Sequence, residues 1–304
     1  FEEIGFNKNL SINDLGYLIG PIINSGGRLG YSNYGIDLLT SKNPLIIKKR
    51  SNQLVSLNKK RKILEKRILK NINFNQIKKE NKNVIIYFNP GIHEGLIGII
   101  AARLKDYFNK PSIVITNSNN ILKGSARSTS EYNIGSLIRL LNDKDIIVNG
   151  GGHNKAAGFT MEKHNIKMLD KFIQNDYSNK IFNFDNSLKY DAEISFSAIN
   201  GNFLNEINKI GPFGNENPLP TFLIKNLKIV KVKIINNEHI SAILKPNNGS
   251  SIKAICFNCM NTQLSKYLLS YKKKINVISE IHENIWNNKK NIHLNIKDIF
   301  LKVD

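Results

Sequence analysis

Three glycines followed by a histidine form the segment whose chemistry is easiest to argue. The segment is Gly150, Gly151, Gly152 and His153, and an apolar run at 145–149 precedes it. Glycine inside regular structure costs about 0.5–1 kcal/mol relative to alanine, so the run indicates that something approaches the main chain closely. If a strand over 145–149 enters a glycine turn, the turn exposes main-chain N–H groups to an anion such as phosphate. His153 would donate a hydrogen bond to that phosphate or assist proton transfer. A tight turn beside a surface histidine is the alternative, and the segment alone does not decide.

The segment GSARS, residues 124–128, brings hydroxyl groups and a guanidinium group together. On a strand, Ser125 and Arg127 lie two residues apart and therefore point to the same face. A guanidinium group with a neighbouring hydroxyl can grip a phosphate through two parallel hydrogen bonds. A polar edge strand is the other interpretation of this segment.

A third glycine-rich segment, NSGGRLG at 24–30, carries Asn24 and Arg28. It is interpreted as a loop that either ends a helix or contacts a phosphate. All seven arginines of this lysine-rich chain lie in its first half. A retained arginine in a glycine-rich loop indicates a need for the planar fork of guanidinium. We therefore predict that Arg28, Arg127 and His153 meet around one pocket for an oxyanion.

Several common sites are absent from the sequence. No phosphate-binding G-x-x-x-x-G-K-[ST] motif occurs, and HEGLI at 93–97 lacks the second histidine of a zinc-binding helix. Cys256 and Cys259 form one C-x-x-C pair, whereas a structural zinc site needs four ligands. We expect free thiols in a reducing cytoplasm. No run of 18 apolar residues and no signal peptide is visible.

The formal net charge of +20 and the pI near 9.8 favour a polyanionic partner. Nucleic acid is the first candidate and an anionic membrane surface the second. An AT-rich genome would also enrich lysine, asparagine and isoleucine, and composition alone does not separate these explanations. The 304 residues, 41% of them hydrophobic, are enough for two domains with cores of their own.

The first 78 residues read as helical. Residues 10–43 suggest short helices interrupted by glycine, and residues 44–72 suggest one long basic helix that starts at Pro44. The apolar positions that recur at helical spacing in the long helix are Ile47, Leu54, Leu57, Leu64 and Ile68.

Strands and helices alternate between 84 and 176. We expect strands at 84–88, 111–116, 121–128, 145–149 and 156–161, and helices at 91–108, 133–142 and 163–176. This alternation predicts an α/β domain.

The last third is rich in strands. The expected strands are 188–196, 221–235, 239–245, 251–257, 275–281 and 291–301, and the expected helices are 201–209 and 261–269. Five or six strands with an inserted helix predict a small β-barrel of the OB-fold type.

Five motifs occur in a fixed order: GPIINSGGRLG, PGIHEGLIGIIAARL, LKGSARS, GGGHNKAAGF and GPFGNENPLPTF. With them the chain resembles the RecJ family of bacterial single-strand-specific 5′→3′ DNA exonucleases, within the DHH phosphoesterase superfamily. The resemblance implies an α/β DHH-associated domain, preceded by a long connecting helix and followed by an OB-fold. The implied boundaries are 1–78 for the end of the DHH lobe and the helix, 79–180 for the α/β domain and 181–304 for the OB-fold.

The resemblance also implies roles for individual residues. His153 becomes catalytic, and the substrate-phosphate contacts are Asn24, Arg28, Ser125 and Arg127, with Gly151 and Gly152 shaping the loop. In the OB-fold the candidate nucleic-acid contacts are Lys231, Lys233, Lys253 and Trp286. Bases could also stack on Phe257, Tyr267 or Tyr271.

The chain departs from the family in two ways. It has no Asp-His-His triplet, so a metal-binding lobe that holds Mn²⁺ or Mg²⁺ is absent and no metal ligand is expected here. Because the chain opens at Phe1 without methionine, we interpret it as a C-terminal portion, and because the metal-binding lobe is missing we expect it to be inactive alone. Ile22 after Pro21 and Ser25 after Asn24 also depart from the family pattern, which has an arginine and an alanine there.

The predicted function is that of a single-stranded-DNA-specific exonuclease in DNA repair and recombination, located in the cytoplasm. The expected partners are single-stranded DNA, a single-strand-binding protein and a helicase, with no membrane; the protein is expected to be a monomer. Two alternatives stay open: a non-catalytic module that binds single-stranded nucleic acid, and a relative of the oligonucleotide or dinucleotide phosphodiesterases.

Overall fold

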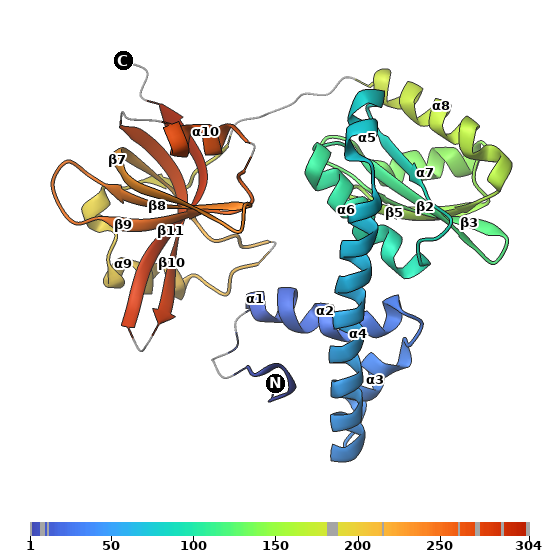
Figure 1. The fold of residues 1–304 in the computed structure, drawn as a ribbon, viewed down its shortest axis with the longest axis horizontal. Coiled ribbons are helices and arrows are strands. Elements are labelled where there is room, and N and C mark those ends of the chain that lie inside the picture. Colours follow the sequence, from blue (N-terminus) through green and yellow to red (C-terminus); the bar gives the residue numbers. More distant parts are fainter. Residues whose placement is uncertain are drawn as a thin grey trace. The chain divides into compact units, whose positions relative to one another are not determined.

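The chain forms two compact units in the computed structural model, Phe1–Asp185 and Asn186–Asp304, and each is described by itself (Figure 1). The structure describes residues 2–6, 10, 12–180, 188–214, 216–260, 262–270, 274–286 and 289–301. Within these ranges, no helix is both long enough and apolar enough to cross a membrane.

The first unit begins with the predicted short helices. They are η1 (Glu2–Ile4), α1 (Ile12–Asp14), the π-helical turn η2 (Leu15–Ile19), α2 (Gly20–Arg28) and α3 (Asn33–Thr40). The expectation of a loop at 24–28 is wrong, because α2 continues to Arg28. Gly26 lets α2 pack closely: a Cβ atom there would lie 2.6 Å from the carbonyl oxygen of Tyr31 and 3.1 Å from a methyl of Leu54.

The predicted long helix is α4 (Pro44–Asn71), followed by α5 (Phe74–Glu80). Its start is fixed by Asn43, whose side chain accepts a hydrogen bond from the backbone N–H of Leu45. Helices α2 and α3 pack against α4 (Figure 1). Of the predicted apolar positions only Leu54 is fully buried, and α4 buries three polar residues instead: Asn58, Arg61 and Glu65.

A five-stranded sheet forms the body of the first unit. Its strands are β1 (Ile85–Phe88), β2 (Ser112–Ser118), β3 (Ile121–Arg127), β4 (Asn149–His153) and β5 (Ala156–Met161), in the order β1-β2-β3-β5-β4. Only the β1–β2 pair is parallel within this sheet. The helices of the α/β domain are α6 (Glu94–Phe108), α7 (Ile134–Asp143) and α8 (Ile166–Ser178), the last preceded by η3 (Lys163–Asn165).

The glycine run is itself a strand, which corrects the prediction of a strand at 145–149 followed by a glycine turn. Strand β4 pairs with β5 at the edge of the sheet, so its main chain joins a ladder instead of forming an anion-binding turn. Ile146 and Ile147 are buried before the strand begins. The close packing of helix α7 requires glycine in this strand, because a Cβ atom on Gly150 would lie 2.6 Å from the Ile138 side chain.

The second unit is a closed five-stranded barrel, as predicted. Its strands are β7 (Thr221–Ile235), β8 (His239–Lys245), β9 (Ile252–Cys256), β10 (Ile275–Trp286) and β11 (Lys289–Leu301). The order β10-β11-β9-β8-β7 is closed by pairing of β10 with β7, and β11 runs parallel to β9. Register shifts in β7 and β10 coil these long strands, which a small closed barrel requires.

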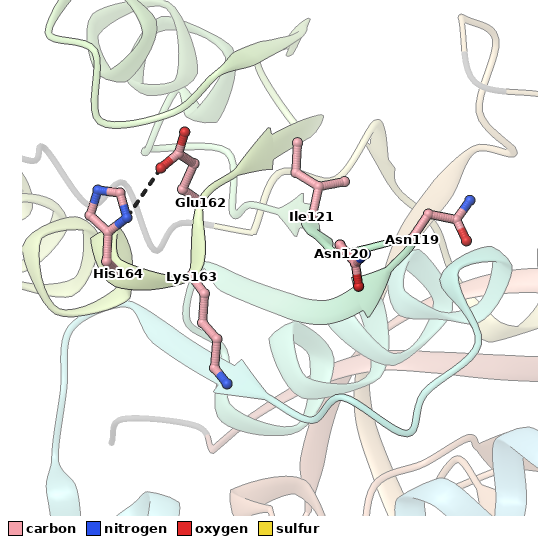
Figure 2. A pocket seen from close by; sticks show the side chains of 6 residues that line it. All are labelled: Asn119, Asn120, Ile121, Glu162, Lys163 and His164. Atoms are coloured by element: carbon pink, nitrogen blue, oxygen red, sulfur yellow. Dashed lines mark ion pairs between the residues drawn. The ribbon is translucent and has the colours of Figure 1, made fainter.

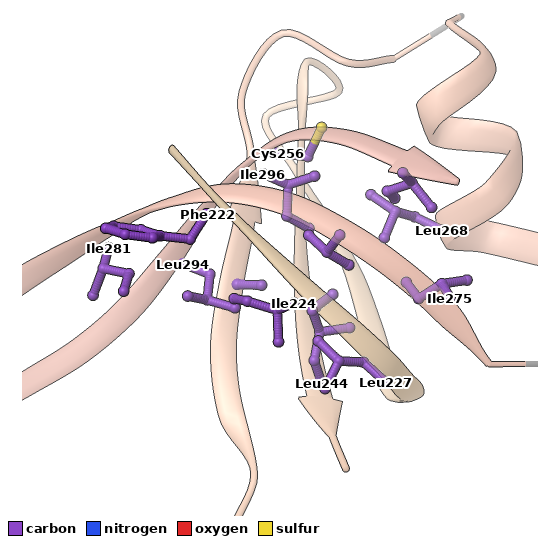
Figure 3. Close-up of a cluster of buried hydrophobic side chains, with 14 of the residues drawn as sticks. Phe222, Ile224, Leu227, Leu244, Cys256, Leu268, Ile275, Ile281, Leu294 and Ile296 are labelled. Atoms are coloured by element: carbon purple, nitrogen blue, oxygen red, sulfur yellow. The ribbon is translucent and has the colours of Figure 1, made fainter. Parts of the chain in front are cut away.

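Two helices accompany the barrel, α9 (Gly201–Lys209) and α10 (Gln263–Ser270), both close to the predicted ranges. The predicted strand at 188–196 is mostly wrong, because only β6 (Ala192–Glu193) pairs with β7. Figure 3 shows the barrel core, in which Phe222 and Ile224 of β7 meet Leu244 of β8 and Leu294 of β11, and α10 contributes Leu268.

Candidate phosphate and nucleic-acid site

Helix α6 presents two glycines to two arginines that come from distant parts of the sequence. Gly95 and Gly98 are three residues apart and lie on one side of the helix. A Cβ atom on Gly95 would lie 2.0 Å from the carbonyl oxygen of Arg28, and one on Gly98 would lie 3.0 Å from a terminal nitrogen of Arg127. Close packing on α6 therefore brings the end of α2 and the end of β3 together.

Arg28 is fixed by this packing. Its Nη1 donates a hydrogen bond to the carbonyl oxygen of Gly95 at 3.2 Å, in the first turn of α6. His93 caps the same turn, because its Nδ1 accepts the backbone N–H of Gly95 at 3.1 Å. His93 therefore has a structural role, and the positive end of the α6 dipole lies beside the Arg28 guanidinium group.

Ser125 and Arg127 lie on strand β3 and share one face, as their spacing predicts. Exposure alternates along β3, with Leu122, Gly124 and Ala126 buried between partly exposed neighbours. Nη1 of Arg127 donates to the carbonyl oxygen of Ala126 at 2.8 Å and to Oγ of Ser125 at 3.3 Å. The guanidinium group is thus held by its own strand beside the serine hydroxyl.

Strand register places His153 on the same face of the sheet. Arg127 pairs with Ala156 across β3–β5, and Ala156 pairs with His153 across β5–β4. Directly paired residues have their side chains on the same face. His153 is exposed, and its Nδ1 accepts the backbone N–H of Lys155 at 3.4 Å.

The next row on this face is almost free of side chains. Ser125 pairs with Gly158, and Gly158 pairs with Gly151. Both glycines are exposed; a Cβ atom on Gly151 would touch nothing within 4 Å, and one on Gly158 would make only an ordinary contact at 3.7 Å. Neither has a positive φ. No internal contact or backbone strain demands glycine at these two positions, in contrast to the packed Gly152, whose Cβ would lie 2.4 Å from the carbonyl oxygen of Ala156.

An open depression of about 520 Å³ lies over this row. It is lined by Ile97 of α6 and by residues of three strands, namely Lys123, Gly124, Asn149, Gly150, Gly151, Gly158, Phe159 and Thr160. We call the face formed by β3, β5 and β4 on this side the glycine floor; its members are Lys123, Ser125, Arg127, Ala156, Gly158, Thr160, Asn149, Gly151 and His153.

The electrostatics of the site favour an anion. Burial lowers the pKa of Arg127, and the nearby charge of Arg28 lowers this pKa further. Burial likewise lowers the pKa of Arg28, and the charge of Arg61 lowers it further, while the charge of Glu65 partly opposes this shift. Both arginines remain charged at neutral pH, so they repel one another across a partly buried space and an anion between them relieves the repulsion.

Asn24 lies on α2, four residues before Arg28 and therefore on the same side of the helix, where it is exposed. Its neighbour Ser25 is buried and donates hydrogen bonds to the carbonyl oxygens of Ile22 at 2.6 Å and Leu54 at 3.0 Å. Ile22 is also buried. Both departures from the family pattern are thus buried, and Ser25 contacts α4 directly.

The sequence interpretation missed a polar network that continues this site. Arg61 of α4 pairs with Glu65 at 2.8 Å, and Glu65 also pairs with Arg103 of α6 at 2.8 Å. Asn58, Arg61 and Glu65 continue the buried positions of Leu54 at helical spacing, with intervals of four, three and four residues. That spacing predicts burial from the sequence only if polar residues are included in the helical pattern of buried positions.

The candidate lysines of the second unit lie on the outer face of the barrel. Lys231 pairs with Ile243, Ile243 pairs with Lys253, and Lys253 pairs with His293, in one row across four strands. Lys233 lies in the adjacent row and is exposed, as are Lys231 and Lys253. The structure therefore brings all three predicted lysines onto one continuous surface.

The aromatic candidates differ in position. Phe257 is 51% exposed, and its ring meets His239 edge-on at 5.4 Å. Tyr267 packs partly against the barrel core and accepts a hydrogen bond from Gln263. Tyr271 and the side chain of Trp286 lie outside the described part of the chain.

A second open depression, of about 630 Å³, lies at the other end of β3 (Figure 2). It is lined by Asn119, Asn120, Ile121, Glu162, Lys163 and His164, and Glu162 pairs with His164 at 3.1 Å. Ile121 and Arg127 are six residues apart on one strand, which separates them by about 20 Å. This depression is therefore remote from Arg127, although Ile121 lies only two residues from Lys123 of the glycine floor, and the sequence motifs did not point to it.

The described residues do not fit a metal centre. Among them, no three His, Cys, Asp or Glu side chains gather as ligands of a metal ion. Cys256 and Cys259 are free and buried, and burial raises the pKa of the Cys256 thiol. No step of the chemistry is therefore derived through a metal held by these residues.

Comparison with protein families identifies both units. A DHHA1 domain matches residues 81–179, and a RecJ OB domain matches residues 190–298. The chain thus carries a DHHA1 domain followed by an OB domain of the RecJ type.

RecJ exonucleases are among the proteins that the chain resembles in sequence. The single-stranded-DNA-specific exonuclease RecJ of Bacillus subtilis is 28% identical over 93% of this chain, and that of Haemophilus influenzae is 29% identical over 89%. The chain spans 36% and 50% of the length of these two relatives. The predicted resemblance to RecJ is confirmed.

The fold is also that of a solved RecJ. The crystal structure of RecJ from Thermus thermophilus in complex with Mn²⁺ matches the whole of this chain and 43% of its own chain, with a TM-score of 0.81 and 19% identity. This likeness confirms the predicted α/β DHH-associated domain and OB-fold.

Proposed function

We propose that the chain supplies the phosphate- and strand-binding surfaces of a single-stranded-DNA-specific 5′→3′ exonuclease. The observation that carries the proposal is the glycine floor, on which Ser125, Arg127 and His153 surround an exposed glycine row beside Arg28. Its supports are the RecJ relatives, which align with nearly the whole chain. The activity belongs to the intact protein, and this chain contributes binding.

The residues divide the work at the glycine floor. Arg28 and Arg127 hold a backbone phosphate and offset the negative charge that develops on it during hydrolysis. Ser125 donates a hydrogen bond to the same phosphate. Gly151 leaves the space through which that phosphate and its sugar approach the main chain. Gly152 contributes indirectly, by letting β4 pack on β5.

His153 and Asn24 complete the proposed site. His153 is the proposed catalytic residue, because its exposed ring can donate a hydrogen bond to the phosphate or move a proton at the leaving oxygen. Asn24 shares the side of α2 that carries Arg28, so its amide group can support the same phosphate.

A divalent cation, Mn²⁺ or Mg²⁺, would be bound by a DHH-type lobe. Residues 1–78 would form the last part of this lobe and the connecting helix. On this proposal residues 79–180 form the DHH-associated domain and residues 181–304 the OB-fold. The chain is then inactive by itself, and any nuclease activity that remains with it after purification contradicts this division.

The barrel would guide the single strand. In OB-folds, the face of strands 2 and 3 binds oligonucleotides, and these strands correspond to β8 and β9. Lys231, Lys233 and Lys253 would follow the phosphates there, while Phe257 or Trp286 offers a ring for a base at about 1–3 kcal/mol per base.

The cellular setting proposed for the intact enzyme follows from this chemistry. An exonuclease for single strands acts in the cytoplasm on intermediates of DNA repair and recombination. A helicase would supply its substrate, and a single-strand-binding protein would share that substrate. We propose that the enzyme acts as a monomer.

Binding by this chain tests the proposal directly. A labelled single-stranded oligonucleotide with a 5′-phosphate should bind, and Arg127→Ala should weaken binding by about 1.5–3 kcal/mol. Arg139→Ala removes the same charge from the exposed side of α7 and should change affinity little. Equal losses in both variants would show that only net charge matters and would refute the site.

Binding of single strands, combined with a cleavage assay, separates the alternatives. Tight binding of single strands, together with no cleavage by a longer protein that includes the preceding sequence, would favour a non-catalytic binding module. Preference for a dinucleotide over an oligonucleotide would favour a phosphodiesterase of short substrates.

A further inference from the structure

Helix α4 carries a buried polar network on the side that packs against the rest of the first unit. Arg61 donates from Nε to Asn58 at 3.1 Å and from Nη1 to Glu65 at 2.8 Å. All three residues are less than 10% exposed. A carboxylate is buried at a high desolvation cost unless its charge is paired, and Arg61 provides that pairing.

Glu65 has a second partner that the packing of α4 does not require. Its Oε1 accepts the Nε–H of Arg103 at 2.8 Å, while the Arg103 side chain is 57% exposed. An exposed arginine usually samples many rotamers, which must be frozen before it can hold a ligand. Here a buried carboxylate fixes the guanidinium group by its Nε edge. Among the described residues, no hydrogen-bond partner is recorded for its two terminal nitrogens.

Arg103 lies close to the candidate site along α6. Gly98, which packs against Arg127, is five residues from Arg103. Five residues of α-helix rise by about 7.5 Å and leave the two positions about 140° apart around the axis, so Arg103 lies further along α6 and on another side of it, where it meets Glu65 of α4. A stacked single strand rises by about 3.4 Å per nucleotide, so this separation corresponds to about two nucleotides. Four of the seven arginines, Arg28, Arg61, Arg103 and Arg127, thus lie on or beside α6.

From this geometry we propose that Arg103 contacts a second phosphate of the strand whose first phosphate is held by Arg28 and Arg127. Glu65 is then a positioning residue, which acts on the strand only through Arg103. The inference rests on the proposed function and extends it from one phosphate to a stretch of backbone. It also explains an arginine at an exposed position of a lysine-rich chain, because only guanidinium can be held by Nε and still present two donors.

A series of ligands with one, two and three phosphates tests the proposal on the 304-residue chain. The ligands are thymidine 5′-monophosphate and the 5′-phosphorylated di- and trinucleotides of thymidine, and binding is measured by calorimetry. Wild-type affinity should rise with length. Arg103→Ala should leave the mononucleotide unaffected and weaken the trinucleotide about five-fold, the upper end for a half-exposed ion pair.

Further variants separate charge from geometry. Arg103→Lys keeps the charge, but lysine has no Nε–H that Glu65 can hold in this way. This variant should therefore lose most of the gain in affinity between the mononucleotide and the trinucleotide. Glu65→Gln should reduce the trinucleotide increment without changing mononucleotide binding, whereas a merely structural role would weaken both ligands. Arg139→Ala, with an exposed arginine on α7, serves as the control.

The outcomes distinguish failure of the second-phosphate contact from failure of the proposed function. If Arg127→Ala weakens every ligand but Arg103→Ala does not reduce the gain with length, the second-phosphate contact is refuted and the first site stands. If Arg127→Ala changes no ligand, the proposed function fails and the second contact fails with it. A drop of about 0.7 in the slope of log affinity against log salt for Arg103→Ala would support one lost phosphate contact.

Discussion

Replacing Gly152 by alanine should destabilise the first unit, whereas replacing the adjacent Gly151 by alanine should stabilise it. A Cβ atom on Gly152 would lie 2.4 Å from the carbonyl oxygen of Ala156 and 2.5 Å from Cα and Cβ of Ala157. These neighbours are backbone or short side-chain atoms that cannot rotate away, so β4 must move from β5. Overpacking of this kind costs about 1–3 kcal/mol.

Gly151 has no such constraint. A Cβ atom there meets nothing within 4 Å, and the residue does not have a positive φ. Alanine should then stabilise the fold by about 0.4–1 kcal/mol, because it restricts the unfolded chain more than glycine does. The same methyl group projects from the glycine floor into the space where we place the phosphate, so affinity for a single strand should fall about five-fold or more, as overpacking implies.

Scanning calorimetry with a binding titration measures both effects. For a unit of this size about 1 kcal/mol corresponds to about 2–4 °C, so Gly152→Ala should lower the Tm of the first unit by about 4–8 °C for a loss of about 2 kcal/mol. The transition of the barrel unit is the internal control. A Gly152→Ala variant as stable as wild type, or a Gly151→Ala variant with normal affinity, would refute the division into a packing glycine and a binding glycine.

Three other substitutions probe the remaining charges. Arg127→Lys keeps the charge but loses the fork, so affinity for a phosphorylated strand should fall by about 1.5 kcal/mol, measured by fluorescence anisotropy; unchanged affinity would mean that charge alone suffices. Lys253→Ala should lower the slope of log affinity against log salt by about 0.7, and an unaltered slope would remove this lysine from the strand path. Burial raises the pKa of Glu280, but hydrogen bonds from His282 and Lys297 lower it more strongly. The net result is a pKa below the ordinary value of 4.5 for a glutamate side chain. Its ionised form therefore stabilises the barrel above that pH, and this contribution is lost as pH falls through the lowered pKa. Glu280→Gln should make stability in urea less dependent on pH between about 7 and about 3, whereas an unchanged pH dependence would show that other carboxylates dominate.

Local rules predicted the elements whose sequence signals are strong and mutually consistent. The two-residue spacing of Ser125 and Arg127 placed them on one face of β3, since period two is intrinsic to a strand. Strand β7 and helix α9 begin and end at the predicted residues because turn signals flank clear apolar patterns. The OB-fold followed from several such strands in succession.

The glycine run was misread because its cause is tertiary. Glycine is depleted in strands by propensity, so a run of three argues for a turn when only neighbours in sequence are considered. In the structure, Gly150 and Gly152 are small because Ile138 of α7 and Ala157 of β5 pack against them. Contacts between residues far apart in sequence overrode the local preference, and the proposed anion site therefore lies on the face of a sheet instead of at a turn.

The polar network of α4 was missed for a related reason. A hydrophobic period finds buried positions only where the buried residue is apolar, whereas Asn58, Arg61 and Glu65 are buried because they satisfy one another. Their pairing could be predicted from the i, i+4 spacing of Arg61 and Glu65 alone. The contact with Arg103 could not, because it depends on how α6 packs against α4.

The distribution of partners among the arginines explains how a fold can keep so much positive charge in one place. In the described part of the chain, Glu65 is the one carboxylate recorded in an ion pair with the cluster of Arg28, Arg61, Arg103 and Arg127. Its ion pairs are with Arg61 and Arg103, and its charge also raises the pKa of Arg28. Arg28 and Arg127 are instead held by main-chain carbonyl groups and the Ser125 hydroxyl. Neutral acceptors fix the direction of a guanidinium group without cancelling its charge. Carboxylates at the same places would cancel this charge, so the neutral acceptors at Arg28 and Arg127 are what the proposed phosphate site requires.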